Sequence, residues 1–175
     1  MTQYGFYFNG QRCTGCKTCV MACKDKNDLA ETINFRNVLE YGGGTWTRAD
    51  DGTWGTDTFA YNVSVACNHC DMPACLGKCP QGALTKDDET GAVLRDEEKC
   101  IGCGTCVKSC PYEVPVVDTE TMKSMKCDGC AARVAEGKMP ICVDACPLRA
   151  LEFGDIEELR TAHPDAVDGI APMAS

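Results

Sequence analysis

The sequence is poor in the aliphatic and aromatic side chains that form most protein interiors. Among its 175 residues, Val, Ile, Leu and Phe together make up about 17%, and there are 2 Trp and 2 His. With a net charge of −9, this composition is typical of chains that do not collapse unaided. Another kind of group must therefore contribute to the interior.

Long apolar segments and positive charge are scarce as well. No stretch approaches the roughly 20 apolar residues of a membrane span, so no direct membrane crossing is expected. The start of the chain has no apolar segment of signal-peptide length, so we expect no export signal on this chain itself. Because 17 Lys and Arg face 26 Asp and Glu, direct binding to nucleic acid or anionic lipid is not expected.

Cysteine is the residue in excess. All 16 cysteines fall into four groups of four with short spacings, which we number in chain order. They are Cys13, Cys16, Cys19 and Cys23 (group one); Cys67, Cys70, Cys75 and Cys79 (group two); Cys100, Cys103, Cys106 and Cys110 (group three); and Cys127, Cys130, Cys142 and Cys146 (group four).

Groups one and three have the spacing C-x2-C-x2-C-x3-C of bacterial ferredoxins. Three thiolates so close together can hold one [4Fe-4S] cluster, whereas the fourth lies about 6 Å further along a helix axis. The fourth cysteine of each group is thus predicted to bind a neighbouring cluster. The whole pattern predicts four [4Fe-4S] clusters.

Two other uses of clustered cysteines fit the spacing less well. A zinc-binding structural protein uses two C-x2-C pairs at one tetrahedral site, which gives no reason for further cysteines packed so closely. Eight disulfides within such tight groups would be strained. Zinc is the alternative from another functional class, and it predicts a colourless protein where iron–sulfur clusters predict a brown one.

Flanking sequences indicate which groups exchange their fourth cysteine. Residues 83–85 and 92–94, between groups two and three, are predicted to pair as the hairpin of a two-cluster ferredoxin. The Pro-x-x-Ala-Leu that begins at Pro80, after group two, is repeated at Pro147, after group four. Groups two and three are therefore predicted to form one complete module.

The same repeat predicts a second module made from the two ends of the chain. A strand over 4–9 precedes group one, and a strand over 151–154 follows group four. If these two strands pair, groups four and one form a module into which the first is inserted. The competing assignment, which joins group one to two and three to four, leaves the repeated flanks unexplained.

Four predicted ligand sets follow from this pairing, and we call them sets A to D. They are Cys13, Cys16, Cys19 and Cys146 (set A); Cys23, Cys127, Cys130 and Cys142 (set B); Cys67, Cys70, Cys75 and Cys110 (set C); and Cys79, Cys100, Cys103 and Cys106 (set D).

The predicted fold class is α+β, with two bacterial-ferredoxin-like modules, one inserted in the other, each with short antiparallel hairpins and cluster-binding helices. Further helices are predicted over 131–139 and 155–160, the second with Asp155 as its N-cap. The predicted divisions are an outer module (1–40 plus 120–160), an inserted module (60–119), an aromatic hairpin (41–59) and a C-terminal tail (161–175).

The motifs resemble those of a known family. They are Cys13-Thr-Gly-Cys-Lys-Thr-Cys19, Cys67-Asn-His-Cys70, Pro73-Ala-Cys75, Cys79-Pro80, Cys100-Ile-Gly-Cys103, Cys110-Pro-Tyr112, Lys126-Cys-Asp-Gly-Cys130, Pro140-Ile-Cys142 and Cys146-Pro-Leu-Arg-Ala-Leu151. Over nearly the whole chain, the sequence resembles the four-cluster iron–sulfur subunit of the dimethyl sulfoxide reductase family of molybdopterin oxidoreductases. Lys24 departs from the ferredoxin pattern, which has proline there.

This resemblance implies a non-catalytic electron-transfer subunit. It would relay electrons through four [4Fe-4S] clusters between a molybdopterin-containing catalytic subunit and a quinone-linked membrane anchor or other donor. Set A would lie nearest the catalytic subunit and set D nearest the quinone. Nitrate reductase relatives have Trp at the position of Cys103 and a three-iron cluster, so four irons are expected here.

The resemblance also implies a location and leaves alternatives. The expected place is peripheral to the cytoplasmic membrane through partners, on the outer face after export with the catalytic subunit; the alternative is the cytoplasm. The alternatives within electron transfer are a freestanding polyferredoxin and the equivalent subunit of a formate dehydrogenase or hydrogenase. The substrate of the partner enzyme does not follow from this sequence.

A few residues outside the cysteine groups suggest further roles. His69 either tunes a cluster potential or supplies a proton, or it is a hydrogen-bonded surface or supporting residue, which we favour; His163 is assigned no role. Trp46 and Trp54, in a hairpin with Asp51-Gly52 at its turn, either anchor a protein interface or pair across strands over a small core. Cations close to cysteines could offset cluster charge, or form a solvated face. These 11 of the 17 cations are Lys17, Lys24, Lys26, Lys78, Lys99, Lys108, Lys123, Lys126, Arg133, Lys138 and Arg149.

Overall fold

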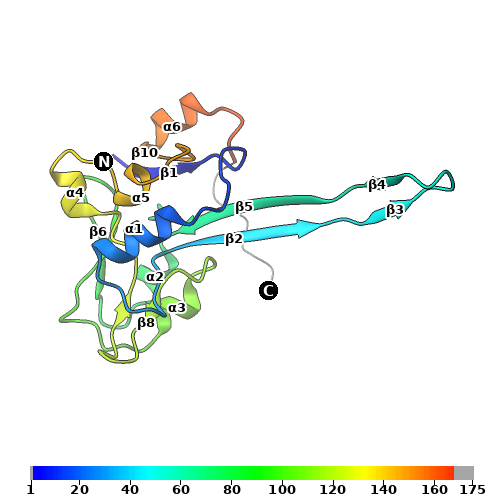
Figure 1. Cartoon of the computed structure of the whole chain (residues 1–175). Helices are drawn as coiled ribbons and strands as arrows, with labels where there is room; N and C mark the ends of the chain where they lie inside the picture. The colour runs from blue at the N-terminus through cyan, green and yellow to red at the C-terminus, as the bar shows by residue number, and fades with distance from the viewer. Residues whose placement is uncertain (1, 168–175) are drawn as a thin grey trace.

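The structure, a computed structural model, describes residues 2–167 and is a small mixed α/β arrangement of short helices and two-stranded antiparallel sheets (Figure 1). The helices are α1 (Thr18–Lys26), α2 (Ala74–Gly77), α3 (Thr105–Ser109), α4 (Ala131–Ala135), α5 (Ile141–Asp144) and α6 (Ile156–Ala162). The strands are β1 (Tyr4–Phe8), β2 (Arg36–Gly43), β3 (Trp46–Arg48), β4 (Trp54–Thr56), β5 (Phe59–Ala66), β6 (Leu84–Lys86), β7 (Val93–Arg95), β8 (Val116–Val117), β9 (Ser124–Met125) and β10 (Leu151–Asp155).

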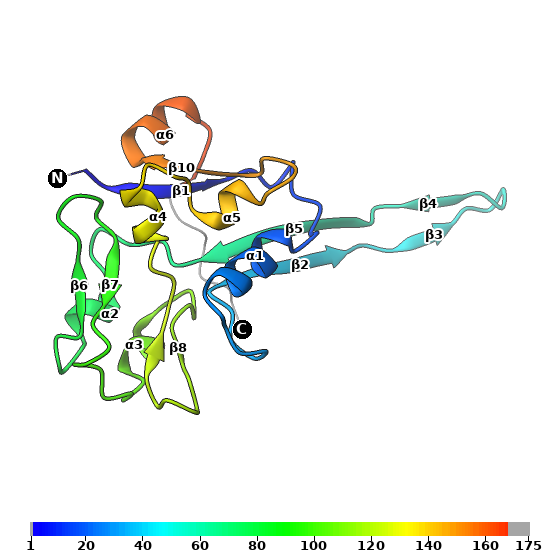
Figure 2. The ribbon, with the colours of Figure 1, turned by 60° about the vertical axis from the view of Figure 1, so that its left-hand side comes forward.

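Strands from opposite ends of the chain pair with each other. β1 and β10 are antiparallel, in a register that runs from Tyr4 opposite Asp155 to Phe8 opposite Leu151. Phe153 packs against the rings of Tyr4 and Phe6, with centroids 5.5 and 4.9 Å apart. Figure 2 shows the two strands side by side beneath α6. The strand pairing predicted from the repeated flank is therefore confirmed.

Two other predicted elements are confirmed with small shifts. β6 and β7 form the hairpin between groups two and three, one residue later than predicted. Asp155 caps α6, because its Oδ1 accepts from the backbone N–H of Glu157 at 2.8 Å and of Glu158 at 3.3 Å. Part of the predicted tail over 161–175 lies outside the described residues.

The helix predicted over 131–139 is too long. α4 ends at Ala135, and Gly137 has φ +73°, where the backbone turns back. The backbone N–H of Lys138 then donates to the carbonyl of Arg133 at 2.9 Å. A glycine in the left-handed region just past a helix is a common terminator, so the shorter helix has a plain local cause.

The aromatic hairpin is longer than predicted. β2 and β5 pair over eight residues each, and β3 and β4 continue the same ribbon to a turn at Gly52, which has φ +86°. The prediction over 41–59 missed the inner part of both long strands. Figure 1 shows this ribbon reaching far from the rest of the chain, and we call residues 36–66 the arm.

Cysteine is the most frequent residue in the interior. In the described part of the chain, nine of the 21 buried apolar side chains are cysteines. Three small clusters combine them with a few aliphatic and aromatic groups, such as Leu29 and Phe35 in one and Leu84 and Val93 in another. Among the described helices, none has both the length and the apolar character that a membrane crossing requires.

Candidate metal centres

One cavity is lined by all four thiols of set A. Cys13 and Cys16 lie in the loop before α1, Cys19 lies on α1, and Cys146 arrives from the segment after α5. The pairing of β1 with β10 brings these two distant segments together. Phe8, Val38 and Leu151 are among the apolar side chains that complete the walls.

A second cavity is lined by all four thiols of set D. Cys100, Cys103 and Cys106 come from the loop before α3 and from α3 itself, and Cys79 comes from the segment after α2. The β6–β7 hairpin connects these two segments, as β1 and β10 connect those of set A. Leu84, on β6, is among the lining residues.

Thiols within set B and within set C also influence one another. Burial is the main cause that raises the pKa of Cys23 to about 11, and the thiols of Cys142 and Cys130 act in the same direction. Burial likewise raises the pKa of Cys75, with Cys67 and Cys110 acting in the same direction.

The four sets follow one another in a row. Cys19 of set A shares a buried cluster with Cys142 of set B. Cys67 of set C packs against the buried cluster that contains Cys23 and Cys127 of set B. Cys75 of set C packs with Cys106 of set D. The order through the molecule is therefore A, B, C, D.

The exposed thiols lie at the two ends of this row. Cys16 of set A and Cys103 of set D are the two exposed cysteines among the described residues. The pKa of each is lowered, chiefly by a hydrogen bond with the threonine two residues later, Thr18 or Thr105. Both hydrogen bonds thus favour the thiolate form.

Backbone and hydroxyl donors are directed at several sulfurs. The backbone N–H of Ala150 donates to Cys146 Sγ at 3.2 Å, and that of Ala83 donates to Cys79 Sγ at 3.3 Å. Ser124 Oγ lies 3.0 Å from Cys106 Sγ. Hydrogen bonds of this kind favour the thiolate form and are among the groups that set iron–sulfur potentials.

These residues fit iron–sulfur clusters. In the end cavities, four thiols from two segments surround one space, apolar side chains form part of the walls, and backbone N–H groups face sulfur. No trio of His, Cys, Asp or Glu side chains within residues 2–167 gathers closely enough for a single metal ion. The thiols of sets A and D instead line the walls of a shared cavity in each case.

Lys24 has a structural role that explains the missing proline. Its Nζ donates to the carbonyls of Ala30, Glu31 and Ile33, at 2.6, 2.7 and 2.9 Å. α1 continues through this position to Lys26, whereas a proline there would break the helix. The departure from the ferredoxin pattern therefore extends a helix and fixes the loop after it.

His69 is a buried, hydrogen-bonded residue. It is 4% exposed, and its Nδ1 accepts from the backbone N–H of Val93 at 2.9 Å. Burial and then the nearby charge of Lys126 lower the pKa of His69 to about 3. The favoured interpretation was right that His69 is hydrogen-bonded, but a position at the surface is wrong. A neutral imidazole is expected near pH 7.

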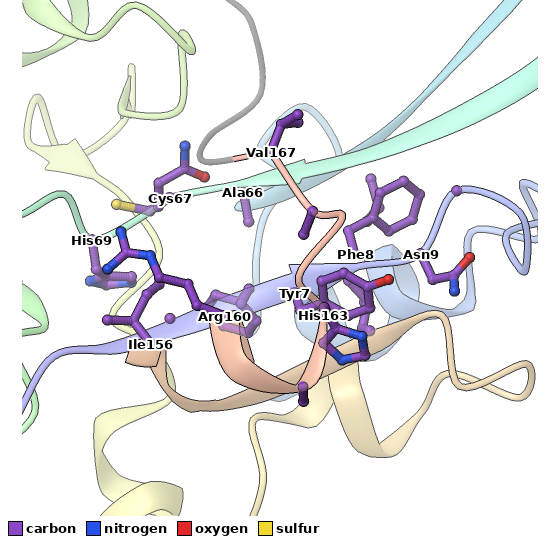
Figure 3. Close-up of a pocket in the computed structure, with 18 of the residues that line it drawn as sticks. Tyr7, Phe8, Asn9, Ala66, Cys67, His69, Ile156, Arg160, His163 and Val167 are labelled. Carbon is purple, nitrogen blue, oxygen red and sulfur yellow. The ribbon is translucent and has the colours of Figure 1, made fainter. Parts of the chain in front are cut away.

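His163 lies at a large open cavity of about 970 Å3 (Figure 3). Its ring stacks on that of Tyr7 with centroids 3.6 Å apart, and its Nε2 lies 3.0 Å from a carboxylate oxygen of Glu152. Figure 3 shows this pair apart from Cys67 and His69, which line the cavity elsewhere. His163 therefore holds the segment after α6 against β1.

Three of the 11 cations near the cysteines pair with carboxylates among the described residues. Lys99 lies 3.1 Å from Asp96, Lys138 lies 2.7 Å from Glu136, and Arg133 pairs with Asp144. These contacts agree with the solvated-face interpretation for part of that set. A further cation, Arg36, was not expected from the sequence; it is 3% exposed and lies on the arm, far from any cysteine along the chain.

Trp46 and Trp54 lie near the tip of the arm, and each is 62% exposed. A cross-strand pair covering a small core would bury both rings, so that alternative is wrong. Phe59 and Tyr61, further down the arm, are also exposed and stack with centroids 6.2 Å apart.

Comparison with known sequences agrees with the cysteine arrangement. Residues 58–156 match a family model described as a 4Fe-4S dicluster domain, and residues 11–30 match one described as a 4Fe-4S binding domain. The B subunit of the anaerobic dimethyl sulfoxide reductase of Haemophilus influenzae is 53% identical over 173 residues, which is 99% of this chain and 83% of that protein. The present protein belongs to the dimethyl sulfoxide reductase iron–sulfur subunit family.

Other relatives agree on the role. The B subunit of the Escherichia coli anaerobic dimethyl sulfoxide reductase is 52% identical over 172 residues, 98% of this chain and 82% of that one. The thiosulfate reductase electron transfer subunit PhsB of Salmonella typhi is 38% identical over 157 residues, 89% of this chain and 78% of that one. The present subunit is accordingly an iron–sulfur electron-transfer component of a reductase complex and not its catalytic component.

Proposed function

We propose that this subunit holds four [4Fe-4S] clusters, one on each of sets A to D, and relays electrons along the row. The observation that carries the proposal is that each end cavity is lined by all four thiols of one set, drawn from two segments. When bound, the clusters would supply one-electron redox chemistry. The protein's part is to bind them, exclude water and hold them in order.

The ligand sets imply a nested organisation. Groups two and three, over 60–119, would form an inserted ferredoxin-like module, and residues 1–40 and 120–160 an outer one. The β1–β10 and β6–β7 pairs support this proposal, because each links the two segments of one end cavity. The arm then leaves the outer module between groups one and two.

The partner at one end is proposed to be a molybdopterin-containing catalytic subunit. The names of the relatives describe subunits of dimethyl sulfoxide and thiosulfate reductases, which supports a partner that reduces a small oxidised substrate. The exposure of Cys16, a member of set A, suits electron exit from that set to this partner. Trp46 and Trp54, exposed on the arm, are proposed to contact it as well.

The partner at the other end is proposed to be a quinone-linked membrane anchor. Cys103, the exposed thiol of set D, would mark that contact. The complex would then be peripheral to the cytoplasmic membrane through its partners, on the outer face, after export with the catalytic subunit. Expressed without partners, this subunit is expected to stay in the cytoplasm, and its appearance outside the membrane would contradict the export proposal.

Anaerobic co-expression with the neighbouring catalytic subunit tests the main proposal. We expect a brown complex that contains molybdenum and, in this subunit, about 16 iron atoms. Stable copurification separates this proposal from a freestanding polyferredoxin. A colourless subunit with zinc in place of iron would overturn it.

A further inference from the structure

Two cations are buried between the thiol sets, and within residues 2–167 neither has a carboxylate partner. Arg36 is 3% and Lys126 6% exposed. Their polar contacts are to a hydroxyl and to backbone carbonyls. Burying an unpaired charge is unfavourable unless a nearby anion offsets it.

Arg36 lies between sets A and B. It opens β2, and its Nη1 donates to Ser64 Oγ at 3.0 Å, while that hydroxyl lies 3.8 Å from Cys19 Sγ. The guanidinium lies 5.1 Å from the centroid of the Phe6 ring, and its Nε has no hydrogen-bond partner among the described residues.

Its surroundings belong to both sets. The Ser64 hydroxyl that accepts from Arg36 lies 3.8 Å from Cys19 Sγ of set A. Phe35, the residue before Arg36, packs in the buried cluster that contains Cys23 and Cys127 of set B. One buried cation thus lies beside ligand segments of both sets.

Lys126 lies between sets B and C. Its Nζ donates to the carbonyls of Val93, on β7, and of Cys127. Cys127, the next residue along the chain, belongs to set B. Val93 packs in a buried cluster with Cys75 of set C. Asp128, whose carboxylate accepts from the backbone N–H of Cys130 at 2.8 Å, places one negative charge at set B.

We propose that Arg36 and Lys126 are internal counter-charges that raise the reduction potentials of the clusters on sets A, B and C, most strongly on set B, which lies between them. The inference rests on the proposed function. Reduction by one electron adds one unit of negative charge and neither makes nor breaks a bond to the protein. A fixed cation nearby stabilises the more negative form, and the low dielectric of a buried site strengthens the effect.

Exposed cations near the cysteines are expected to have a much smaller effect on the reduction potentials than Arg36 and Lys126. Lys99, next to Cys100, is 57% exposed and pairs with Asp96. Solvent and salt screen such a charge, so its removal is expected to change little. Lys99→Gln is therefore the matched control for the loss of one positive charge.

The test is a dithionite titration of the purified, iron-loaded subunit, or its complex, followed by electron paramagnetic resonance. Arg36→Gln is expected to reduce the equilibrium constant for one-electron reduction at sets A and B about tenfold, equivalent to about 59 mV. Lys126→Gln is expected to have a similar effect at sets B and C. The reduction potentials of Arg36→Lys, which keeps the charge, and of Lys99→Gln are expected to stay near those of the unmodified subunit.

Each result decides for or against the proposal. Equal shifts in Arg36→Gln and Arg36→Lys would assign the effect to packing and overturn it, as would unchanged potentials in both glutamine variants. Loss of iron from Arg36→Gln but not from Arg36→Lys would show the same need for positive charge, and loss from both would overturn it. An unmodified subunit without iron would instead refute the proposed function.

Discussion

Sets A and D, at opposite ends of the row, share a local framework. In each, a threonine follows the exposed cysteine by two residues, and a serine hydroxyl lies near the third cysteine of the run. In each, the backbone N–H of an alanine four residues on donates to the cysteine from the distant segment. The repeated sequence motifs therefore reproduce the arrangement around the thiols in detail.

Their surroundings differ. Beside set A, the ribbon that supplies Ser64 has eight-residue strands and continues into the aromatic arm. Beside set D, the ribbon that supplies Ser124 has strands of only two residues, joined by a short loop. The thiol framework is thus common to both ends, and the adjoining ribbon distinguishes them. Different partner contacts at the two ends are the expected consequence.

Removal of iron should have the largest effect, and the two ends of the row should lose their structure at different stages. Chelation under reducing conditions is expected to collapse the far-UV circular dichroism signal, because few aliphatic side chains oppose about 1–2 kcal/mol of backbone entropy per ordered residue. Set D, whose segments are joined by a short hairpin, should outlast set A during partial iron loss. Cooperative unfolding of an iron-free chain would contradict this expectation.

Substitution of the cysteine from the distant segment should affect one end at a time. Cys146→Ser is expected to alter the same cluster signals as Cys13→Ser, and Cys79→Ser the same signals as Cys103→Ser. Electron paramagnetic resonance of the four variants measures this. Should Cys146→Ser change the signals assigned through Cys127 and leave those of Cys13 intact, the nested arrangement would be wrong.

The arm should matter for assembly and not for iron binding. Trp46→Ala with Trp54→Ala is expected to weaken binding of the catalytic subunit at least tenfold, since buried interface tryptophans contribute about 2 kcal/mol or more each. Iron content should be unchanged. Ile101→Ala, a change at an exposed apolar residue beside set D, is the matched control and should leave binding to the catalytic subunit intact. Binding is measured with the anaerobically purified subunits.

Loss of the equivalent hydroxyls should have the smallest effect and should be unequal. Ser124→Ala removes a contact of 3.0 Å to Cys106, whereas Ser64→Ala removes one of 3.8 Å to Cys19. We expect the free energy of one-electron reduction to change by about 1 kcal/mol at set D and by less at set A. Redox titration of each variant measures the difference, and a larger shift for Ser64→Ala would contradict the comparison.

Much of the fold could be predicted from short spacings and repeats. The proline-alanine-leucine motif after groups two and four led to the pairing of β1 with β10, although some 140 residues separate the strands. Turn chemistry placed the tip of the arm at Asp51-Gly52. These features depend on local sequence, which is why they could be predicted.

Other features depend on contacts between distant segments. The arm was predicted too short because the glycines after Tyr41 weaken the strand pattern of the sequence. The long strand β2 becomes evident only through its pairing with β5. Arg36 was missed because it lies 13 positions after Cys23 and approaches the thiols only through β2 and β5. That this charge is buried beside cysteines is therefore evident only from the fold.

The central claim, that the sixteen cysteines hold four iron–sulfur clusters, is tested most directly by metal analysis of the anaerobically purified subunit. The account predicts about 16 iron atoms per chain, little zinc and a brown protein whose electron paramagnetic resonance spectrum on reduction shows interacting clusters. About four zinc atoms with little iron would contradict it.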